Sequence, residues 1–183
     1  MKSALPLLLP LALLAPATAA APKTSLDRIL ADRLPALGHR NWIVIADSAY
    51  PLQTSPGIET ITVKDSQLSA VRQTLRALSK TKHVRPTIYL DKELAFVPEK
   101  HAPGITKFRK DLNQMMIGRK AQRLPHEEII AKLDEAGRTF KVLLIKTPHI
   151  QPYTSVFFQL ECGYWSDRAE QDLRDAMKGA SGK

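Results

Sequence analysis

Three short polar segments beside predicted strands contain residue types that transfer protons or bind hydroxyl groups. His39 precedes the apolar run Trp42–Ala46, Asp47 follows that run, and Tyr153 and Ser155 introduce the last apolar run of the chain. A histidine titrates near neutral pH and can donate or accept a proton. An ionised aspartate can accept two hydroxyl groups, and tyrosine and serine hydroxyls can bind further polar atoms. These segments are therefore the first candidates for a site.

The position of Asp47 supports this interpretation but does not require it. An aspartate at the carboxyl end of a buried strand lies where ligands bind in open α/β sheets. Without other evidence, a plain Asx turn at a strand exit is the favoured explanation of Asp47. His39 also fits either a catalytic role or a polar turn between a helix and a strand. Both alternatives stay open at the level of single residues.

The apolar spacing predicts the elements that position these segments. Leu68, Val71, Leu75 and Leu78 repeat at helical spacing, whereas Trp42–Ala46 is a continuous apolar run typical of a strand buried on both faces. Helices are predicted over residues 26–37, 68–78, 103–117, 126–137 and 166–183, and strands over residues 42–46, 58–63, 87–90, 140–145 and 155–161. This mixture predicts an α/β/α sandwich with a central sheet. The basic residues between Lys107 and Arg123 are expected to form an exposed helix face and a loop.

Residues 1–19 have the features of a cleaved signal peptide. A positive start is followed by an apolar centre and by a small-residue Ala17-Thr18-Ala19 exit. Pro6, Pro10 and Pro16 interrupt the run and argue against a membrane-spanning helix. The protein is therefore expected to be exported, either to the periplasm or to the medium, with no stable membrane insertion after cleavage. Loss of Lys2 lowers the formal charge from +9 to +8.

Several functional signatures are absent from the sequence. There is no Gly-rich phosphate loop, His-Glu-x-x-His motif, Gly-x-Ser-x-Gly motif or cysteine pair, so metal, nucleotide and serine-hydrolase functions have no motif support. The single cysteine, Cys162, lies in an apolar segment and is either buried or paired between subunits, and burial is the expectation. His149 lies in a proline-bounded loop and is expected at the surface. His83 and His101 lie in polar surroundings and need no role.

Four motifs in order along the chain carry a family resemblance. They are Leu-Gly-His at 37–39, Asp-Ser-x-x-Pro at 47–51, Pro-His-Glu-Glu at 125–128 and Pro-Tyr-x-Ser at 152–155, before a strand that ends near Gly163. The pattern resembles the ribose pyranase and fucose mutarotase (RbsD/FucU) family over roughly residues 26–165. The expected organisation is a signal peptide at 1–19, an RbsD/FucU-like domain at 20–165 with a central mixed sheet, and a polar tail at 166–183.

The resemblance implies an isomerase that needs no cofactor or metal and interconverts ring forms or anomers of a free monosaccharide. It also implies a ring-shaped homo-oligomer with sites between subunits. By position, His39 corresponds to the family's catalytic histidine, Asp47 to its sugar-binding aspartate and His126 to its second histidine. Tyr153 corresponds to the tyrosine of the family's Tyr-x-Asn motif. Ser155 replaces the asparagine of that motif, which puts the identity of the sugar in doubt.

The spacing of His39 and Asp47 gives an independent geometric prediction. They are separated by eight positions across a strand, which at about 3.3 Å per residue corresponds to roughly 20–26 Å. One sugar cannot contact both side chains in a single chain unless the segment bends. The spacing therefore favours a site shared between neighbouring subunits.

Two other functions remain open from the sequence. A non-catalytic exported carbohydrate-binding or envelope protein on the same scaffold would also fit, although binding alone does not need both His39 and His126. An unrelated exported α/β domain could bind acidic polymers through the basic residues 107–123. For an exported chain, anionic envelope surfaces are more available partners than nucleic acid, so no nucleic-acid partner is expected.

Overall fold

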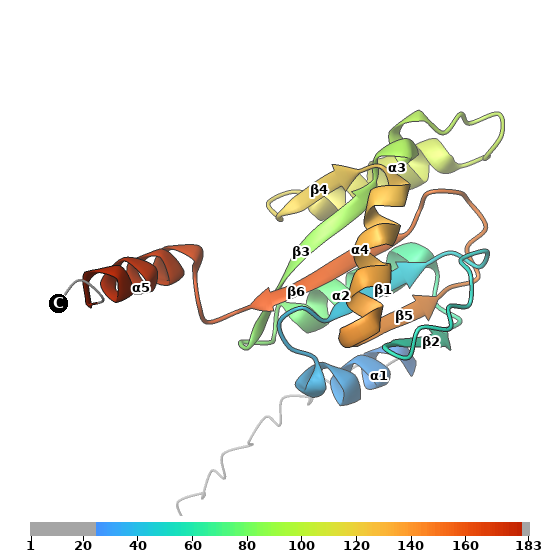
Figure 1. The fold of residues 1–183 in the computed structure, drawn as a ribbon. Coiled ribbons are helices and arrows are strands. Elements are labelled where there is room, and N and C mark those ends of the chain that lie inside the picture. Colours follow the sequence, from blue (N-terminus) through green and yellow to red (C-terminus); the bar gives the residue numbers. More distant parts are fainter. Residues whose placement is uncertain (1–24, 181–183) are drawn as a thin grey trace, which may run out of the picture.

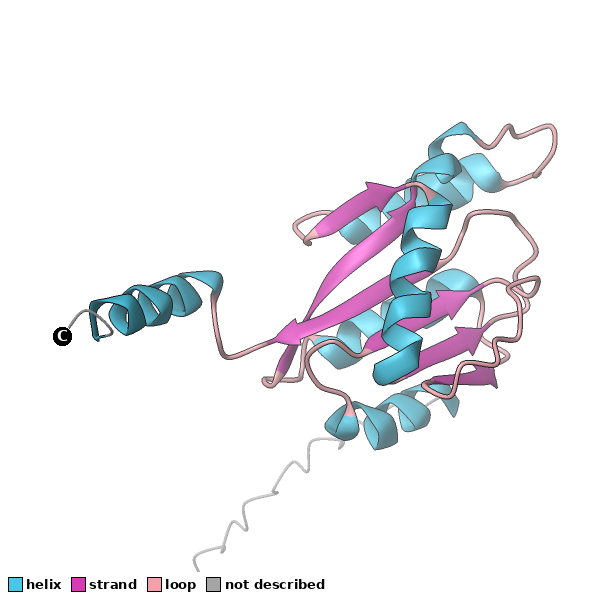
Figure 2. Cartoon of the chain, in the orientation of Figure 1, coloured by secondary structure: helices cyan, strands magenta, loops and turns pink. Residues whose placement is uncertain are grey.

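The computed structural model describes residues 25–180 and contains one six-stranded mixed sheet (Figures 1 and 2). The strand order is β2-β5-β1-β6-β3-β4, and β6 runs antiparallel to both of its neighbours while the other pairs are parallel. The strands are β1 (Trp42–Ala46), β2 (Ile58–Thr62), β3 (Val84–Asp91), β4 (Ala121–Leu124), β5 (Val142–Lys146) and β6 (Val156–Cys162). The carboxyl ends of five strands and the beginning of β6 therefore share one edge, hereafter the carboxyl edge.

Helices cover both faces of the sheet, as Figure 1 shows. α1 (Ser25–Arg33), α2 (Gln67–Leu78) and α3 (Ile105–Met116) pack on one face, and α4 (His126–Thr139) packs on the other. Two short 3-10 helices, Leu34–Ala36 and Lys92–Phe96, follow α1 and β3, and α5 (Asp167–Ala180) follows β6. The predicted α/β/α sandwich with a central mixed sheet is confirmed.

The continuous apolar run of β1 is explained by its central place in the sheet. Ile43 and Ile45 belong to the core under α1–α3, whereas Trp42 and Val44 belong to the core under α4. All five β1 residues are buried. Since successive side chains of a strand point to opposite faces, only a strand covered on both sides needs such an uninterrupted run.

Two sequence-based expectations about the elements are wrong. Residues 121–124 form the edge strand β4, parallel to β3, and not a loop, because backbone pairing with β3 stabilises a segment whose Gln122 and Arg123 side chains are exposed. Gly137 lies inside α4 and does not end it. A Cβ atom at Gly137 would lie 2.8 Å from Cγ1 of Ile58, so this glycine allows a close helix-to-strand contact instead.

The remaining expectations at the chain ends and for the cysteine have different outcomes. The residues proposed as a signal peptide, 1–19, lie outside the described residues. No helix within residues 25–180 is long and apolar enough to cross a bilayer. Cys162 is half-buried where burial was expected, because it ends β6 where the sheet leaves the core. The helix expected near the C-terminus is present as α5.

Candidate functional site at the carboxyl edge of the sheet

The carboxyl edge gathers polar residues from four segments that are distant in sequence. Asp47 follows β1, Asp91 ends β3, His126 follows β4, and Tyr153 and Ser155 precede β6. Because these positions all lie at one edge, the fold brings together four of the five residues predicted from the sequence. Figure 1 shows this edge as the end toward which the arrowheads of β1, β3, β4 and β5 point.

Asp47 is held by one backbone and one side-chain contact. Its Oδ1 accepts a hydrogen bond from the Ala49 amide at 2.9 Å, which is the Asx turn considered above. Its Oδ2 accepts from the Ser155 hydroxyl at 3.4 Å. The turn and the polar pair therefore coexist: the turn orients the carboxylate, while the long bond to buried Ser155 leaves Oδ2 able to accept a further donor.

His126 is the first residue of α4. Asp91 and Tyr153 contact its ring, and Glu93 accepts a hydrogen bond from its backbone. Its Nδ1 lies 3.0 Å from Oδ1 of Asp91, and its backbone N–H donates to the Glu93 carboxylate at 3.0 Å. The Tyr153 ring meets the imidazole edge-on, with 5.7 Å between ring centroids. An ionised Asp91 can only accept, so Nδ1 carries the proton and Nε2 is left as a proton acceptor.

Asp91 is a carboxylate inside the protein, with a relative exposure of only 1%. Burial raises its pKa from 3.8 to about 6, although the hydrogen bond from His126 opposes this rise. Its Oδ2 has no hydrogen-bond partner among the described residues. Asp91 therefore combines an orienting contact through Oδ1 with a second, buried oxygen that has no hydrogen-bond donor among the described residues.

Tyr50 and His149 add two more unpartnered polar atoms near this edge. Burial raises the pKa of Tyr50 far above its usual range, with Asp134, Asp91 and Asp47 adding to the rise. The Tyr50 hydroxyl therefore stays protonated, and like His149 Nε2 it has no partner in the described part of the chain. Buried polar groups are rarely left unpaired, which makes these atoms candidates for ligand contacts.

His149 does not lie at the surface as expected. Its ring stacks on Phe108, with centroids 4.8 Å apart, and it is half-buried. Desolvation lowers its pKa, while the nearby Asp47 carboxylate acts in the opposite direction. The loop carries it inward because the Ser48 amide donates to the His149 carbonyl at 2.8 Å, which joins this loop to the turn after β1.

Buried Gln67, at the start of α2, holds three of these segments together. Its amide nitrogen donates to the carbonyls of Ile45 and Thr154 at 3.0 and 2.9 Å. Its amide oxygen accepts from the Thr147 hydroxyl at 2.6 Å. One side chain thus links the ends of β1 and β5 to the segment before β6, which fixes the positions of Asp47 and Ser155.

His39 is the one predicted residue that the fold does not bring to this edge. It lies in an exposed turn before β1, in which the Asn41 amide donates to the Gly38 carbonyl at 3.1 Å. Asp47 lies beyond the other end of the same strand. Within one chain, His39 and Asp47 are therefore on opposite edges of the sheet, as their spacing predicted.

Asp91, Tyr50, His149 and Gln67 were not predicted from the sequence. Asp91 carried a usable signal, since it directly follows the predicted strand 87–90 just as Asp47 follows 42–46. The other three depend on loop packing that spacing alone does not encode. Among the described residues, no group of three or more His, Cys, Asp or Glu side chains is placed to hold a metal ion.

Comparison with known proteins places this chain in one family. A family model described as the RbsD / FucU transport protein family matches residues 22–163. The chain belongs to the RbsD/FucU family. No curated protein matches it in sequence.

Several solved structures align with this chain at low sequence identity. A Streptococcus pneumoniae fucose mutarotase in complex with L-fucose aligns with a TM-score of 0.50 and 17% identity, covering 72% of this chain and 89% of that one. Bacillus subtilis RbsD complexed with D-ribose aligns with a TM-score of 0.49 and 24% identity, covering 76% of this chain and 96% of that one. FucU from Bifidobacterium longum aligns with a TM-score of 0.48 and 15% identity, covering 72% of this chain and 92% of that one.

Proposed function

We propose that this protein is a monosaccharide mutarotase or pyranase that interconverts ring forms or anomers of a free sugar. The observation that carries the proposal is His126, oriented by buried Asp91 and facing the Tyr153 ring on the same edge as the Asp47–Ser155 pair. Membership of the RbsD/FucU family supports it, as does the presence of sugars in the ribose and fucose complexes of similar proteins.

The chemistry requires two proton transfers. Opening a pyranose ring removes a proton from the anomeric hydroxyl and delivers one to the ring oxygen, and closing the ring reverses both. His126 can serve one of these transfers through Nε2, because Asp91 holds Nδ1. Positioned proton transfer of this kind is typically worth about 10²–10⁴ in rate. In the proposal His39 serves the second transfer.

Sugar binding would use the other polar groups. Asp47 Oδ2 is an acceptor. The buried Asp91 Oδ2 and the buried Tyr50 hydroxyl are a further acceptor and donor that have no hydrogen-bond partner among the described residues. Carboxylates bind hydroxyls with charge-assisted strength. The ring of Tyr153, 40% exposed, offers an apolar surface for one sugar face. Ser155 is shorter than the family's asparagine and leaves more room beside Asp47.

A complete site needs a second subunit in this proposal. His39 and Asp47 lie on opposite edges of one sheet, so a single chain cannot present both to one sugar. A ring-shaped homo-oligomer, in which His39 of one subunit approaches the carboxyl edge of the next, would complete the site. We further propose that the enzyme acts after export, in the periplasm or the medium, and that it uses no cofactor.

The direct test is exchange NMR of the mature protein with a panel of free sugars that includes ribose and fucose. We expect faster anomer or ring exchange for at least one sugar, and a loss of about 10²-fold or more in His126→Ala and His39→Ala. His101→Ala is the matched control, because His101 is exposed and outside the site. Binding without faster exchange would favour the alternative of a non-catalytic carbohydrate-binding or envelope protein.

A further inference from the structure

A second carboxylate, that of Glu93, lies beside the Asp91–His126 pair at the carboxyl edge. Glu93 belongs to the 3-10 helix Lys92–Phe96, which begins directly after β3. Asp91 and Glu93 are therefore two positions apart in one turn, and both contact the same histidine. Asp91 contacts the ring of His126, whereas Glu93 accepts a hydrogen bond from its backbone N–H.

Glu93 caps α4 from a different part of the chain. The backbone nitrogen of His126 lies 3.0 Å from Oε1 and 3.1 Å from Oε2 of Glu93. The first N–H groups of a helix have no partner within the helix, and Pro125, which precedes α4, provides no side-chain cap. A carboxylate is also favoured at this end of a helix by the helix dipole.

The turn that carries Glu93 is fixed to the body of the protein. Leu94, the next residue, is 5% exposed and belongs to the core under α1–α3. Just after the 3-10 helix, the carbonyl of Val97 accepts a hydrogen bond from the Arg109 guanidinium of α3 at 2.8 Å. Glu93 is therefore held in place by packing on one side and by a hydrogen bond on the other.

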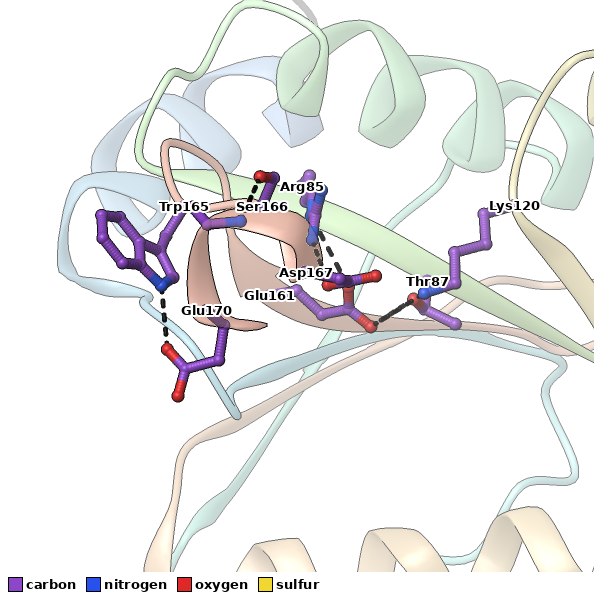
Figure 3. A network of polar contacts seen from close by, with 9 residues as sticks. Arg85, Thr87, Lys120, Glu161, Trp165, Ser166, Asp167 and Glu170 are labelled. Carbon is purple, nitrogen blue, oxygen red and sulfur yellow. Dashed lines mark hydrogen bonds and ion pairs between the residues drawn. The ribbon is translucent and has the colours of Figure 1, made fainter. Parts of the chain in front are cut away.

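The negative charge of Glu93 is not neutralised by a cation. Within residues 25–180, no lysine, arginine or histidine side chain forms an ion pair with Glu93. Figure 3 shows the contrasting arrangement at the opposite edge of the sheet, where Glu161 lies 3.6 Å from both Arg85 and Lys120. The charge of Glu93 therefore acts on its neighbours in the candidate site.

We propose that Glu93 is a positioning residue of the proton-transfer site, which fixes the backbone of His126 while Asp91 fixes its ring. This inference rests on the proposed function, since it takes His126 as a proton-transfer group. A ring held only at Nδ1 can still pivot on that hydrogen bond. A second fixed point, at the backbone nitrogen, removes this freedom and determines where Nε2 lies. Small misplacements of a reacting group reduce rates strongly.

Glu99 shows what the same contact does without a neighbouring site. Its carboxylate accepts hydrogen bonds from the amides of Gly104 and Thr106 and so caps α3. α3 carries none of the residues proposed for proton transfer or sugar binding. Glu99 is therefore a matched control, because its loss removes a helix cap but does not affect His126.

The two carboxylates differ in their effect on Asp91. Asp91 is faced by His126 from α4, by Glu93 from the 3-10 helix and by Asp47 from the turn after β1. The like charge of Glu93 adds to the rise in the pKa of Asp91, whereas the charge of Glu99 has no such effect. This difference gives a measurement that a helix cap alone would not change.

Carbon-13 NMR of the Asp91 carboxyl group is the first test. Glu93→Gln keeps an oxygen that can accept the His126 N–H but removes the charge. We expect the pKa of Asp91 to fall below its wild-type value of about 6 in Glu93→Gln and to stay there in Glu99→Gln. An unchanged pKa in Glu93→Gln would overturn the proposal. The measurement needs no sugar turnover, so it decides the position of Glu93 even if the proposed function fails.

Sugar exchange is the second test. Glu93→Ala removes the hydrogen bond and should lower kcat on the order of tenfold with KM unchanged, because Glu93 does not contact the sugar. Glu93→Gln should recover part of this loss, and Glu99→Ala should keep the wild-type kcat. Equal kcat values for Glu93→Ala and Glu99→Ala would overturn the proposal. A rise in KM alone would also overturn it, since it would make Glu93 a sugar-binding residue.

Discussion

The Nδ1 atom of His126 lies 3.0 Å from Oδ1 of Asp91, so a buried carboxylate at the end of β3 orients an imidazole that follows β4. The two strands are parallel neighbours, with Asp91 in register with Leu124, two residues before His126. The hydrogen bond is therefore supported by backbone pairing and does not depend on a mobile loop. It leaves Nε2 of His126 as the atom available for proton transfer.

Asp91→Asn should reduce sugar exchange without unfolding the protein. Asparagine keeps the shape of the side chain but removes the charge that favours a protonated Nδ1. The amide oxygen can still accept from Nδ1–H, so a charged hydrogen bond becomes a neutral one, a loss of about 1–1.5 kcal/mol that corresponds to a decrease of about 5- to 10-fold in the exchange rate. Asp32→Asn, at an exposed position on α1, is the control. An unchanged rate in Asp91→Asn would show that Asp91 does not position His126 for turnover.

Stability should depend on pH through the Asp91 carboxyl group. Its pKa is raised from 3.8 to about 6 by burial, so between these values the folded protein binds more protons than the unfolded one. The free energy of unfolding should therefore decrease as pH rises through this window, by about 3 kcal/mol from this group. Chemical denaturation of the wild type and Asp91→Asn at several pH values checks this. A difference in the free energy of unfolding between the two proteins that stays constant from pH 3.8 to about 6 would contradict this prediction.

The layers of the fold were predictable because they follow from local patterns. Trp42–Ala46 is apolar without interruption, which requires a strand covered on both faces, and the spacing of the α2 leucines requires one buried helix face. β4 was not predictable in the same way. Its sequence, Ala-Gln-Arg-Leu, has little strand character, and it forms because β3 offers an unpaired backbone edge.

The site was predictable only where a rule relates sequence position to sheet position. Asp47 follows a strand, and a residue that directly follows a strand lies at its carboxyl end, where ligands bind in open α/β sheets. Tyr50 and His149 could not be found in this way, because they come close to Asp47 and Asp91 through loops whose course depends on long-range contacts such as that of Ser48 with His149. Gln67 also had no signal, since a buried glutamine resembles any helix residue until its three partners are known.

Gly137→Ala should destabilise the protein. The added Cβ would lie 2.8 and 2.9 Å from two side-chain carbons of Ile58, so either the Ile58 side chain or α4 would have to move. The expected loss is about 1–3 kcal/mol in the free energy of unfolding, as for other overpacked contacts. Gly179→Ala is the matched control, because a Cβ there meets nothing within 4 Å. Equal melting temperatures for the two variants would contradict the close approach of α4 and β2.

We also expect the exported protein to begin at Ala20 or Ala21. Cleavage would follow the small residues Ala17-Thr18-Ala19 or the next alanine. Intact-mass measurement of protein recovered from the periplasm or the medium checks this directly. Replacing Ala17 and Ala19 with larger residues should cause the precursor to accumulate. Recovery of full-length chain from the cytoplasm alone would contradict export.

A shared site makes a specific prediction for mixtures of inactive variants. His39→Ala and Asp47→Ala should each be inactive as pure proteins. If His39 and Asp47 of one site come from neighbouring subunits, subunits exchanged at a ratio of one to one restore both residues in about a quarter of the interfaces of a cyclic oligomer. The mixture should then recover about a quarter of the wild-type exchange rate, whereas mixing His126→Ala with Asp47→Ala should recover none, because those residues share one edge of one chain. No recovery in the first mixture, with subunit exchange verified by mass, would place both residues in the same subunit's site or remove one of them from the site.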